Sequence, residues 1–244
     1  MFSKKDVCRF VDLTTLNTYD STKSVDAFLK RALTLEKKGF QVAAVCLFPN
    51  FATQSVKKLS ASKIKIAVVA GNFPNSQSFL SVKLHECELA LESGVDELDI
   101  VLNIGAFMDE DYQQVIDEVR AVKNLMGHKT LKVILETGLL KNEKLIKKAA
   151  ELAIEGGADF IKTSTGKDFP GADIKAVEIM SSVILQHYKK TRNYTGLKIS
   201  GGVKTYEHAI EYINCVENIL GVDFIKPELF RIGASSLLNN LTNE

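Results

Sequence analysis

Residues 160–202 read FIKTSTGKDFPGADIKAVEIMSSVILQHYKKTRNYTGLKISGG, and this stretch holds the repeating unit of the fold. A short apolar run over residues 160–165 is followed by a Pro-Gly turn, an amphipathic run over 173–190 and a second short apolar run over 197–202. Short apolar runs bounded by Gly, Ser and Thr are typical of strands, and amphipathic runs of this length are typical of helices. A strand, a helix and a second strand in succession predict a parallel pair of strands joined by a helical crossover.

The same alternation extends along the whole chain, with no linker and no low-complexity tract. The sequence predicts strands over 10–16, 43–48, 64–71, 97–103, 132–137, 160–165, 197–202 and 230–234. It predicts helices over 24–38, 52–60, 81–93, 109–126, 142–155, 173–190 and 206–220, and a short one after Gly233. Glycine follows several of these helices, as expected at helix C-termini.

Eight strands alternating with eight helices predict an α/β protein, a single (β/α)8 or TIM barrel that occupies residues 1–244 as one domain. The alternative is an open, doubly wound sheet. No G-x-G-x-x-G follows the first predicted strand, which removes the main reason to choose that alternative. A barrel of this kind places its active site at the C-terminal ends of the strands.

Composition excludes several classes of partner. The 244 residues are 45% hydrophobic, enough for a large core, and 31 basic against 30 acidic residues leave a net charge of +1. This balance gives no electrostatic reason to expect nucleic acid or an anionic membrane as a partner. The apolar runs are far shorter than the roughly 18 residues of a membrane span, and residues 1–6 do not resemble a signal peptide. We therefore expect a cytoplasmic protein.

The cysteines and histidines show no metal-ligand spacing. Four scattered cysteines form no C-x-x-C, and the four histidines are not clustered. We expect mostly structural thiols in a reduced compartment and no bound metal. Cys46, late in the second predicted strand, fits packing better than chemistry, although a thiol near the barrel mouth is also a candidate for lining the substrate site.

Two lysines stand inside predicted strands, Lys162 and Lys198. Strand interiors of parallel sheets are normally apolar, and an ammonium is costly to bury without partners. Burial lowers the pKa of lysine and frees the amine as a nucleophile, so two such lysines indicate an enzyme that forms an imine. Alternation along the strands gives one possible inward face, which carries Asp12, Thr14, Asp99, Lys132, Glu136, Lys162 and Lys198.

Such a mouth would surround Asp99 with three basic groups. A neighbouring ammonium and partial desolvation lower the pKa of a lysine, while Asp99 would act as general acid and base. The sequence alone leaves open which lysine forms the imine. The alternative interpretation is that some of these charged residues form a structural ion cluster or face the helices instead of the barrel interior.

Glycine-containing loops follow the late strands, at Thr165-Gly166-Lys167, Gly201-Gly202-Val203-Lys204 and Gly233-Ala234-Ser235-Ser236. Barrel phosphate sites are often built from the last loops and a helix N-terminus, and Lys167, Ser235 and Ser236 would add charge and hydroxyl donors. Simple tight turns are the alternative explanation.

At these residues the chain resembles the deoxyribose-phosphate aldolases, a family of class I aldolases, over nearly its whole length. The match rests on segments 11–16, 43–49, 97–101, 132–137, 159–166, 198–203 and 231–236, of which DFIKTSTG at 159–166 is the most specific. The resemblance implies a barrel that cleaves 2-deoxy-D-ribose 5-phosphate reversibly to D-glyceraldehyde 3-phosphate and acetaldehyde, without metal or organic cofactor.

The resemblance also implies a role for each matching residue. Lys162 would be the Schiff-base lysine, Lys198 the lysine that lowers its pKa, and Asp99 the proton relay, through a water. The phosphate ligands would be Gly166, Lys167, Gly201, Gly202, Gly233, Ser235 and Ser236. Lys132, Asp12, Thr14 and Cys46 would support the mouth.

Some family members end in a tyrosine that assists proton transfer, whereas this sequence ends Leu241-Thr242-Asn243-Glu244. A water or another side chain would then carry that proton. Two other interpretations are a transaldolase-like imine barrel, which would use ketone donors, and a non-catalytic sugar-phosphate-binding barrel. A homodimer or homotetramer is a further expectation.

Overall fold

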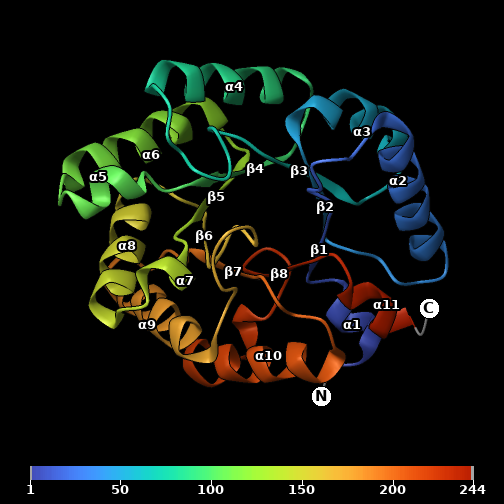
Figure 1. Ribbon diagram of the computed structural model, residues 1–244. Helices are drawn as coiled ribbons and strands as arrows, with labels where there is room; N and C mark the ends of the chain where they lie inside the picture. Colours follow the sequence, from blue (N-terminus) through green and yellow to red (C-terminus); the bar gives the residue numbers. More distant parts are fainter. Residues whose placement is uncertain (1, 243–244) are drawn as a thin grey trace.

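Eight parallel strands form a closed barrel in the computed structural model, which describes residues 2–242 (Figure 1). Neighbours in sequence are neighbours in the sheet, and β8 closes the ring by pairing with β1. The strands are β1 (Val11–Thr14), β2 (Ala44–Leu47), β3 (Lys65–Val69), β4 (Glu97–Val101), β5 (Thr130–Ile134), β6 (Phe160–Lys162), β7 (Gly196–Ser200) and β8 (Phe230–Ala234). The predicted (β/α)8 barrel is confirmed.

Seven of the eight strands end one to three residues earlier than the sequence indicated, and the difference is largest, three residues, in β5 and β6. Strand β5 stops at Ile134 because Glu136 adopts a left-handed conformation, with φ 56°, and begins a helical turn. Strand β6 stops at Lys162, and the amide of Thr165 turns to the Glu136 carboxylate instead of to a neighbouring strand. Glu136 is therefore a loop residue at the mouth, not the strand residue that its spacing predicted.

All eight predicted helices are present, and three short ones were missed. The predicted helices are α2 (Thr22–Lys37), α3 (Ala52–Leu59), α4 (Leu80–Glu92), α6 (Tyr112–Met126), α8 (Glu143–Glu155), α9 (Ile174–Thr191), α10 (Tyr206–Leu220) and α11 (Leu237–Thr242). The missed ones are α1 (Lys4–Cys8), α5 (Ile104–Met108) and α7 (Thr137–Leu140), with two 3₁₀ turns at Pro49–Phe51 and Val222–Phe224.

Side-chain caps decide some of these boundaries. Asn103, predicted at the end of a strand, accepts a hydrogen bond from the Ala106 amide and so starts α5. Asp111 does the same for α6, which therefore begins at Tyr112 instead of residue 109. Each cap is a contact between residues close in sequence, but a side chain can cap a helix only if the preceding segment has already ended.

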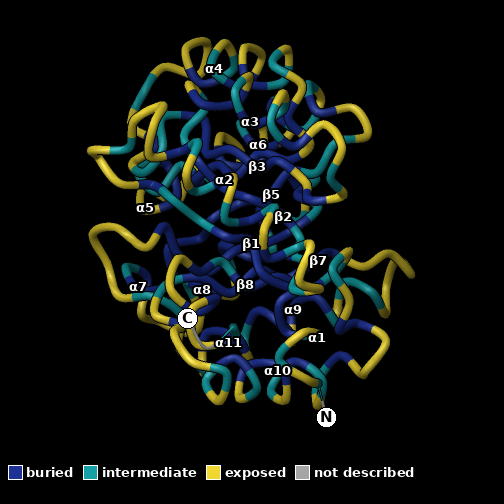
Figure 2. Tube along the Cα trace, turned by 90° about the vertical axis from the view of Figure 1, so that its right-hand side faces the viewer, coloured by how far each residue is buried: buried dark blue, intermediate teal, exposed yellow. Residues whose placement is uncertain are grey.

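The helices surround the barrel as a ring, and the apolar core lies mainly between ring and strands (Figure 1). Figure 2 shows the strands as the most buried part of the chain and the outer turns as the most exposed. Within β4, Leu98 and Ile100 join that outer core, whereas Glu97 and Asp99 face the barrel axis. The interior of the barrel is thus lined with charged side chains, with a small apolar cluster of Leu16, Ala44, Cys46, Ala67 and Val69.

Helices α1 and α11 lie side by side, with the Lys4 ammonium donating to the Asn240 carbonyl at 3.0 Å (Figure 1). The last two residues of the chain, to which the expectation about a terminal tyrosine applied, lie outside the described residues. Within residues 2–242, no helix combines the length and the apolar character that a membrane crossing requires.

Candidate active site

The strand register brings the predicted lysines next to one another. Lys162 on β6 pairs with Lys198 on β7, and Asp99 on β4 pairs with Lys132 on β5. All four side chains point into the barrel, because the residues between them in sequence belong to the core that packs against the helices. The structure therefore assembles one charged centre from four neighbouring strands.

Asp99 lies at the middle of this centre. Its Oδ2 accepts hydrogen bonds from the ammonium groups of Lys162 at 2.7 Å and Lys198 at 2.8 Å. Its Oδ1 accepts one from Lys132 at 3.0 Å. The arrangement of three basic groups around one carboxylate is the one that the strand faces predicted.

A second layer of charges lies deeper in the barrel. Asp12 on β1 pairs with Lys198 at 2.6 Å and with Arg231 at 2.6 Å, and Glu97 pairs with Arg231 at 2.9 Å and with Lys132. Glu97 and Arg231 were not among the predicted site residues. Period-2 alternation from Asp99 and Gly233 would have placed both on the inward faces of their strands.

The seven charged groups do not balance in number. Three carboxylates, Asp12, Glu97 and Asp99, face four basic side chains, Lys132, Lys162, Lys198 and Arg231, and none of the seven is more than 4% exposed. A buried surplus charge without a counterion is costly. The excess of positive charge therefore favours loss of a proton from one of the four basic groups.

The pKa directions single out Lys162. Burial lowers the pKa of Lys162, and the Lys198 ammonium lowers it further against the opposing effect of Asp99. Burial also opposes the charge of Lys198, but Asp12 and Asp99 outweigh it and raise the pKa of Lys198. The difference arises because Lys162 has one carboxylate partner and Lys198 has two.

The carboxylates keep their charge. Desolvation would raise the pKa of Asp99, but the ammonium groups of Lys132, Lys162 and Lys198 hold it well below its ordinary value. Asp12 and Glu97 likewise have lowered pKa values, because their basic partners outweigh the cost of burial. The centre thus combines three carboxylates of lowered pKa with one amine, that of Lys162, whose pKa is also lowered.

A cavity of about 240 Å³ opens above Lys162 at the C-terminal ends of the strands. It is lined by Lys162, by Thr14, and by all seven residues predicted for the phosphate, which are Gly166, Lys167, Gly201, Gly202, Gly233, Ser235 and Ser236. Asp12, Asp99, Lys132 and Lys198 lie beneath it. Thr14 Oγ1 donates to the Asp12 carbonyl at 2.9 Å, which fixes the hydroxyl at the cavity wall.

The glycine loops meet backbone to backbone at this cavity. A Cβ on Gly201 would lie 2.6 Å from the Gly171 Cα, and Gly201 has a φ of 87°. A side chain at Gly201 is therefore excluded both by space and by conformation. Gly233 lies within β8 rather than in the loop after it, and a Cβ there would lie 3.1 Å from the Lys198 Cε.

Lys167, Ser235 and Ser236 are placed at the rim. The Lys167 ammonium contacts the Leu16 carbonyl and lies 5.9 Å from the centroid of the Phe48 ring. Helix α11 after the serines has only six residues, and the threonine cap of α10 lies beyond Lys204, so the loops rather than long helix N-termini surround the cavity.

Two further predicted residues lie near the mouth without lining the cavity, Cys46 and Glu136. Cys46 is fully buried in the apolar cluster, does not line the cavity, and burial raises the pKa of its thiol. Glu136 accepts hydrogen bonds from the Thr165 amide at 3.2 Å and hydroxyl at 2.5 Å, which ties the loop after β5 to the loop after β6. Among residues 2–242, no group of three or more His, Cys, Asp and Glu side chains is arranged to hold a metal ion.

Comparison with known proteins identifies the family. Residues 7–241 match the model of the DeoC/LacD family aldolases. The deoxyribose-phosphate aldolase of Homo sapiens is 36% identical over 248 aligned residues, which cover 96% of this chain and 78% of that protein.

Solved structures agree. An aldolase named QR15 is 34% identical with a TM-score of 0.80, covering 98% of this chain and 95% of its own. A tetrameric deoxyribose-phosphate aldolase from Aeropyrum pernix is 25% identical with a TM-score of 0.78, covering 99% and 92%. The chain belongs to the DeoC/LacD family of aldolases.

Proposed function

We propose that this aldolase reversibly cleaves 2-deoxy-D-ribose 5-phosphate to D-glyceraldehyde 3-phosphate and acetaldehyde, through a Schiff base on Lys162. The observation that carries the assignment of Lys162 is the charge count in the barrel. Lys162 is the basic group with one carboxylate partner, and it lies at the floor of the cavity. Human and mouse relatives named deoxyribose-phosphate aldolase support the substrate.

The first half of the reaction uses Lys162 as a nucleophile. The neutral amine attacks the aldehyde carbon of the open-chain sugar phosphate, and the carbinolamine loses water to give an iminium ion. Lys198 keeps its proton because of Asp12 and Asp99, so its positive charge disfavours reprotonation of Lys162. The fixed charges are in place before the substrate arrives, as electrostatic stabilisation requires.

The second half breaks the carbon–carbon bond. A base removes the proton of the C3 hydroxyl, the C2–C3 electrons move into the iminium, and glyceraldehyde 3-phosphate leaves an enamine on Lys162. Protonation of the enamine at C2 and hydrolysis release acetaldehyde and restore the amine. Asp99 is held ionised, so its role is to orient a water that carries these protons rather than to store one itself.

The rim of the cavity fits the phosphate of such a substrate. Gly166, Gly201 and Gly202 line the opening, and because glycine has no side chain the loop surface there is bare backbone; all three have positive φ, which favours glycine. The Lys167 ammonium adds a positive charge that its present partner, a neutral carbonyl, does not compensate. Replacing Lys167 by Gln should raise KM for the phosphorylated sugar by about 10-fold to 100-fold and leave KM for unphosphorylated deoxyribose unchanged.

The direct experiment traps the imine. Borohydride reduction in the presence of acetaldehyde, followed by peptide mass spectrometry, should place the adduct on Lys162 and give none in Lys162→Met. Turnover of deoxyribose 5-phosphate should accompany it. An adduct confined to another lysine contradicts the assignment of Lys162. Turnover of ketone donors alone would indicate a transaldolase-like enzyme, and calorimetric binding without turnover a sugar-phosphate-binding protein.

The proposal also covers the domain organisation, the cellular location and the oligomeric state of the enzyme. We expect residues 1–244 to act as one aldolase domain in the cytoplasm, without metal or organic cofactor. The aldolase from Aeropyrum pernix is a tetramer, which supports a homodimer or homotetramer here. Sedimentation equilibrium of the purified protein tests the oligomer, and a monomer at all concentrations would contradict it.

A further inference from the structure

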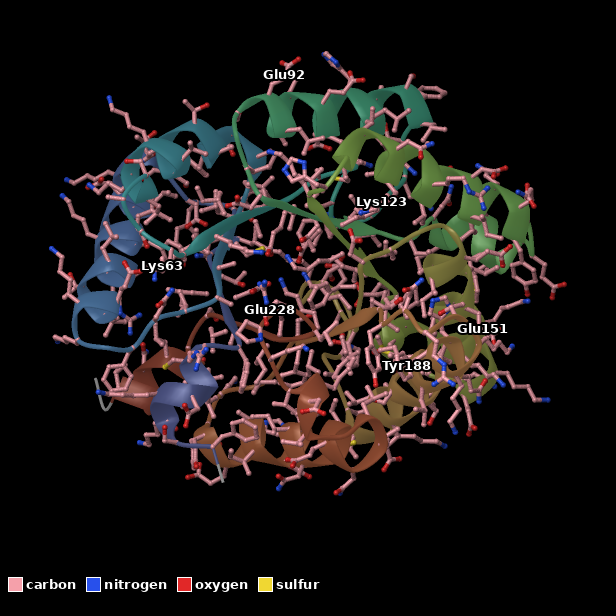
Figure 3. The ribbon with its side chains drawn as sticks, turned by 180° about the vertical axis from the view of Figure 1, so that it is seen from behind. Lys63, Glu92, Lys123, Glu151, Tyr188 and Glu228 are labelled. Carbon is pink, nitrogen blue, oxygen red and sulfur yellow. The ribbon has the colours of Figure 1, made fainter. Side chains whose placement is uncertain are left out.

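Arg231 lies at the end of the barrel opposite the mouth. Its Nε donates to the Pro227 carbonyl in the loop before β8, and Arg231 lines a separate cavity of about 330 Å³ whose other charged residues are Arg9, Lys63, Lys65 and Glu228. Figure 3 looks from behind, with Lys63 and Glu228 labelled; both precede strands, so they mark this opposite end. Arg231 does not line the mouth cavity. It is therefore out of reach of a substrate bound there.

Continuous ion pairs nevertheless connect Arg231 to Lys162. The guanidinium contacts Asp12 at 2.6 Å, Asp12 contacts Lys198 at 2.6 Å, and Lys198 shares the Asp99 Oδ2 atom with Lys162. A second route runs through Glu97 and Lys132 to the other Asp99 oxygen. Every group on both routes is at most 4% exposed, so solvent screens the charges weakly.

We infer that Arg231 and Glu97 are positioning residues that set the protonation state of Lys162 across the barrel through the charge count. With Arg231 present, three carboxylates are balanced by the buried Lys132, Lys198 and Arg231, and Lys162 is the surplus base. Lys65 also approaches Glu97, at 3.6 Å, but its side chain is half exposed and lies outside the buried count. Without Arg231, the same carboxylates need a third cation, and Lys162 becomes the group that supplies it by keeping its proton. The inference rests on the proposed role of Lys162 as nucleophile.

Among the charged groups of the centre, we expect the pKa of Lys162 to change most when a charge is removed, because of the groups that surround it. Asp99 from β4, Lys198 from β7, Cys46 from β2 and Glu136 from the loop after β5 act on it electrostatically. Strand β3 presents apolar Ala67 and Val69, and β8 presents Gly233. Burial opposes the charge of all three lysines. The pKa values of Lys132 and Lys198 are nevertheless raised by their carboxylate partners, whereas that of Lys162 is lowered.

A purely structural role for Arg231 predicts something different. Its guanidinium binds two carboxylates, and loss of such a pair destabilises a fold whatever the active site does. A structural role would lower the melting temperature in every Arg231 variant and would leave the pH dependence of the amine unchanged. The pH profile therefore distinguishes the two roles.

The experiment measures kcat/KM against pH, since this ratio reports the pKa of the free enzyme. In Arg231→Met the acid limb should move to higher pH by about one unit, with activity recovered at alkaline pH. Arg231→Lys keeps the charge and should leave the limb in place, even if it lowers the melting temperature. Arg231→Met combined with Glu97→Gln restores the balance and should return the limb to its wild-type position.

A second readout does not depend on turnover. The pH dependence of reductive alkylation of Lys162 by acetaldehyde and cyanoborohydride, followed by peptide mass spectrometry, reports the neutral amine directly. A shift here in a protein that fails to cleave deoxyribose 5-phosphate would refute the proposed function and retain the inference.

The charge-balance inference is wrong if folded Arg231→Met keeps the wild-type limb, or if the double variant stays shifted. Should Arg231→Met fail to fold, Glu97→Gln replaces it. Removing one anion should move the limb to lower pH, and a limb that stays or rises overturns the inference.

Discussion

Two of the buried ion networks within residues 2–242 differ in their charge count. The first is the barrel centre around Asp99. The second lies between α4 and α6, where Lys83 pairs with Glu118 at 2.8 Å. Ser76 accepts from Lys83 at 3.0 Å, and Asn103 donates to Glu118 at 2.6 Å.

The second network is neutral and its polar groups are satisfied, whereas the barrel centre has four bases for three acids. A neutral, hydrogen-bonded pair has no electrostatic reason to exchange protons, and it fixes the loop of residues 72–79 against α6. The barrel centre has such a reason, because one amine is in excess. Burial alone therefore does not distinguish Lys83 from Lys162, and the balance of nearby charges does.

The largest expected effect is on catalysis in Lys162→Met. Loss of the nucleophile should lower kcat by at least about 1000-fold, because the other lysines that line the cavity, Lys167 and Lys204, are exposed at its rim. The free energy of unfolding should stay the same or rise by about 1 kcal/mol, since a buried polar amine is replaced by an apolar side chain and Asp99 keeps Lys132 and Lys198 as partners. Turnover assays and urea denaturation measure the two effects. A large loss of stability would mean that Lys162 is a structural cation.

Lys198→Met should lower both the stability of the fold and the kcat. Asp12 and Asp99 each lose a partner, which should cost about 3 kcal/mol of unfolding free energy. The kcat should fall by about 100-fold or more, because Lys162 then keeps its proton to balance the carboxylates. Activity should be partly recovered at alkaline pH. An unchanged pH profile in a folded variant would contradict the tuning role of Lys198.

Acid should destabilise the barrel centre. Folding lowers the pKa values of Asp12, Glu97 and Asp99, so their contribution is complete above the unfolded-state values near 4 and is lost as the pH falls below them. The free energy of unfolding should drop by about 2 kcal/mol or more between pH 5 and pH 3, and by less in Asp12→Asn. Equal stability at both pH values would show that the carboxylates are not linked to folding.

The smallest effect on activity is expected in the neutral network. Lys83→Met leaves Glu118 without its ammonium, and because Glu118 is 12% exposed the cost should be about 1–3 kcal/mol. The kcat of the folded variant should stay within about 2-fold of wild type, and its pH profile should not move. A shifted profile would mean that the two networks are coupled, and the comparison between them would fail.

Much of this architecture was visible in the sequence. The alternation of apolar and amphipathic runs predicted all eight strands, because strand and helix periods are local properties. Asp12, Asp99, Lys132, Lys162 and Lys198 stood out because charges inside strands are rare. Glu136 was placed on the wrong element, since its left-handed turn after β5 is fixed by contacts with Thr165 in another loop.

Other features required the tertiary structure. Alternation along their strands places Glu97 and Arg231 on inward faces, but it does not show that the two side chains meet. Only the closed barrel places them 2.9 Å apart beneath the lysines. The short helices α5 and α7 were missed because each begins at a residue that was predicted to lie in a strand, Asn103 for α5 and Glu136 for α7.

The sequence by itself determined the barrel and the presence of two costly strand lysines, because both follow from short-range patterns of polarity. Apart from the family resemblance, it did not determine which of the two lysines has the lowered pKa. That depends on the number of carboxylates each ammonium meets, one for Lys162 and two for Lys198, supplied by β1 and β4 from distant parts of the chain. Electrostatic interactions act through space, so only the folded barrel decides the charge of each group.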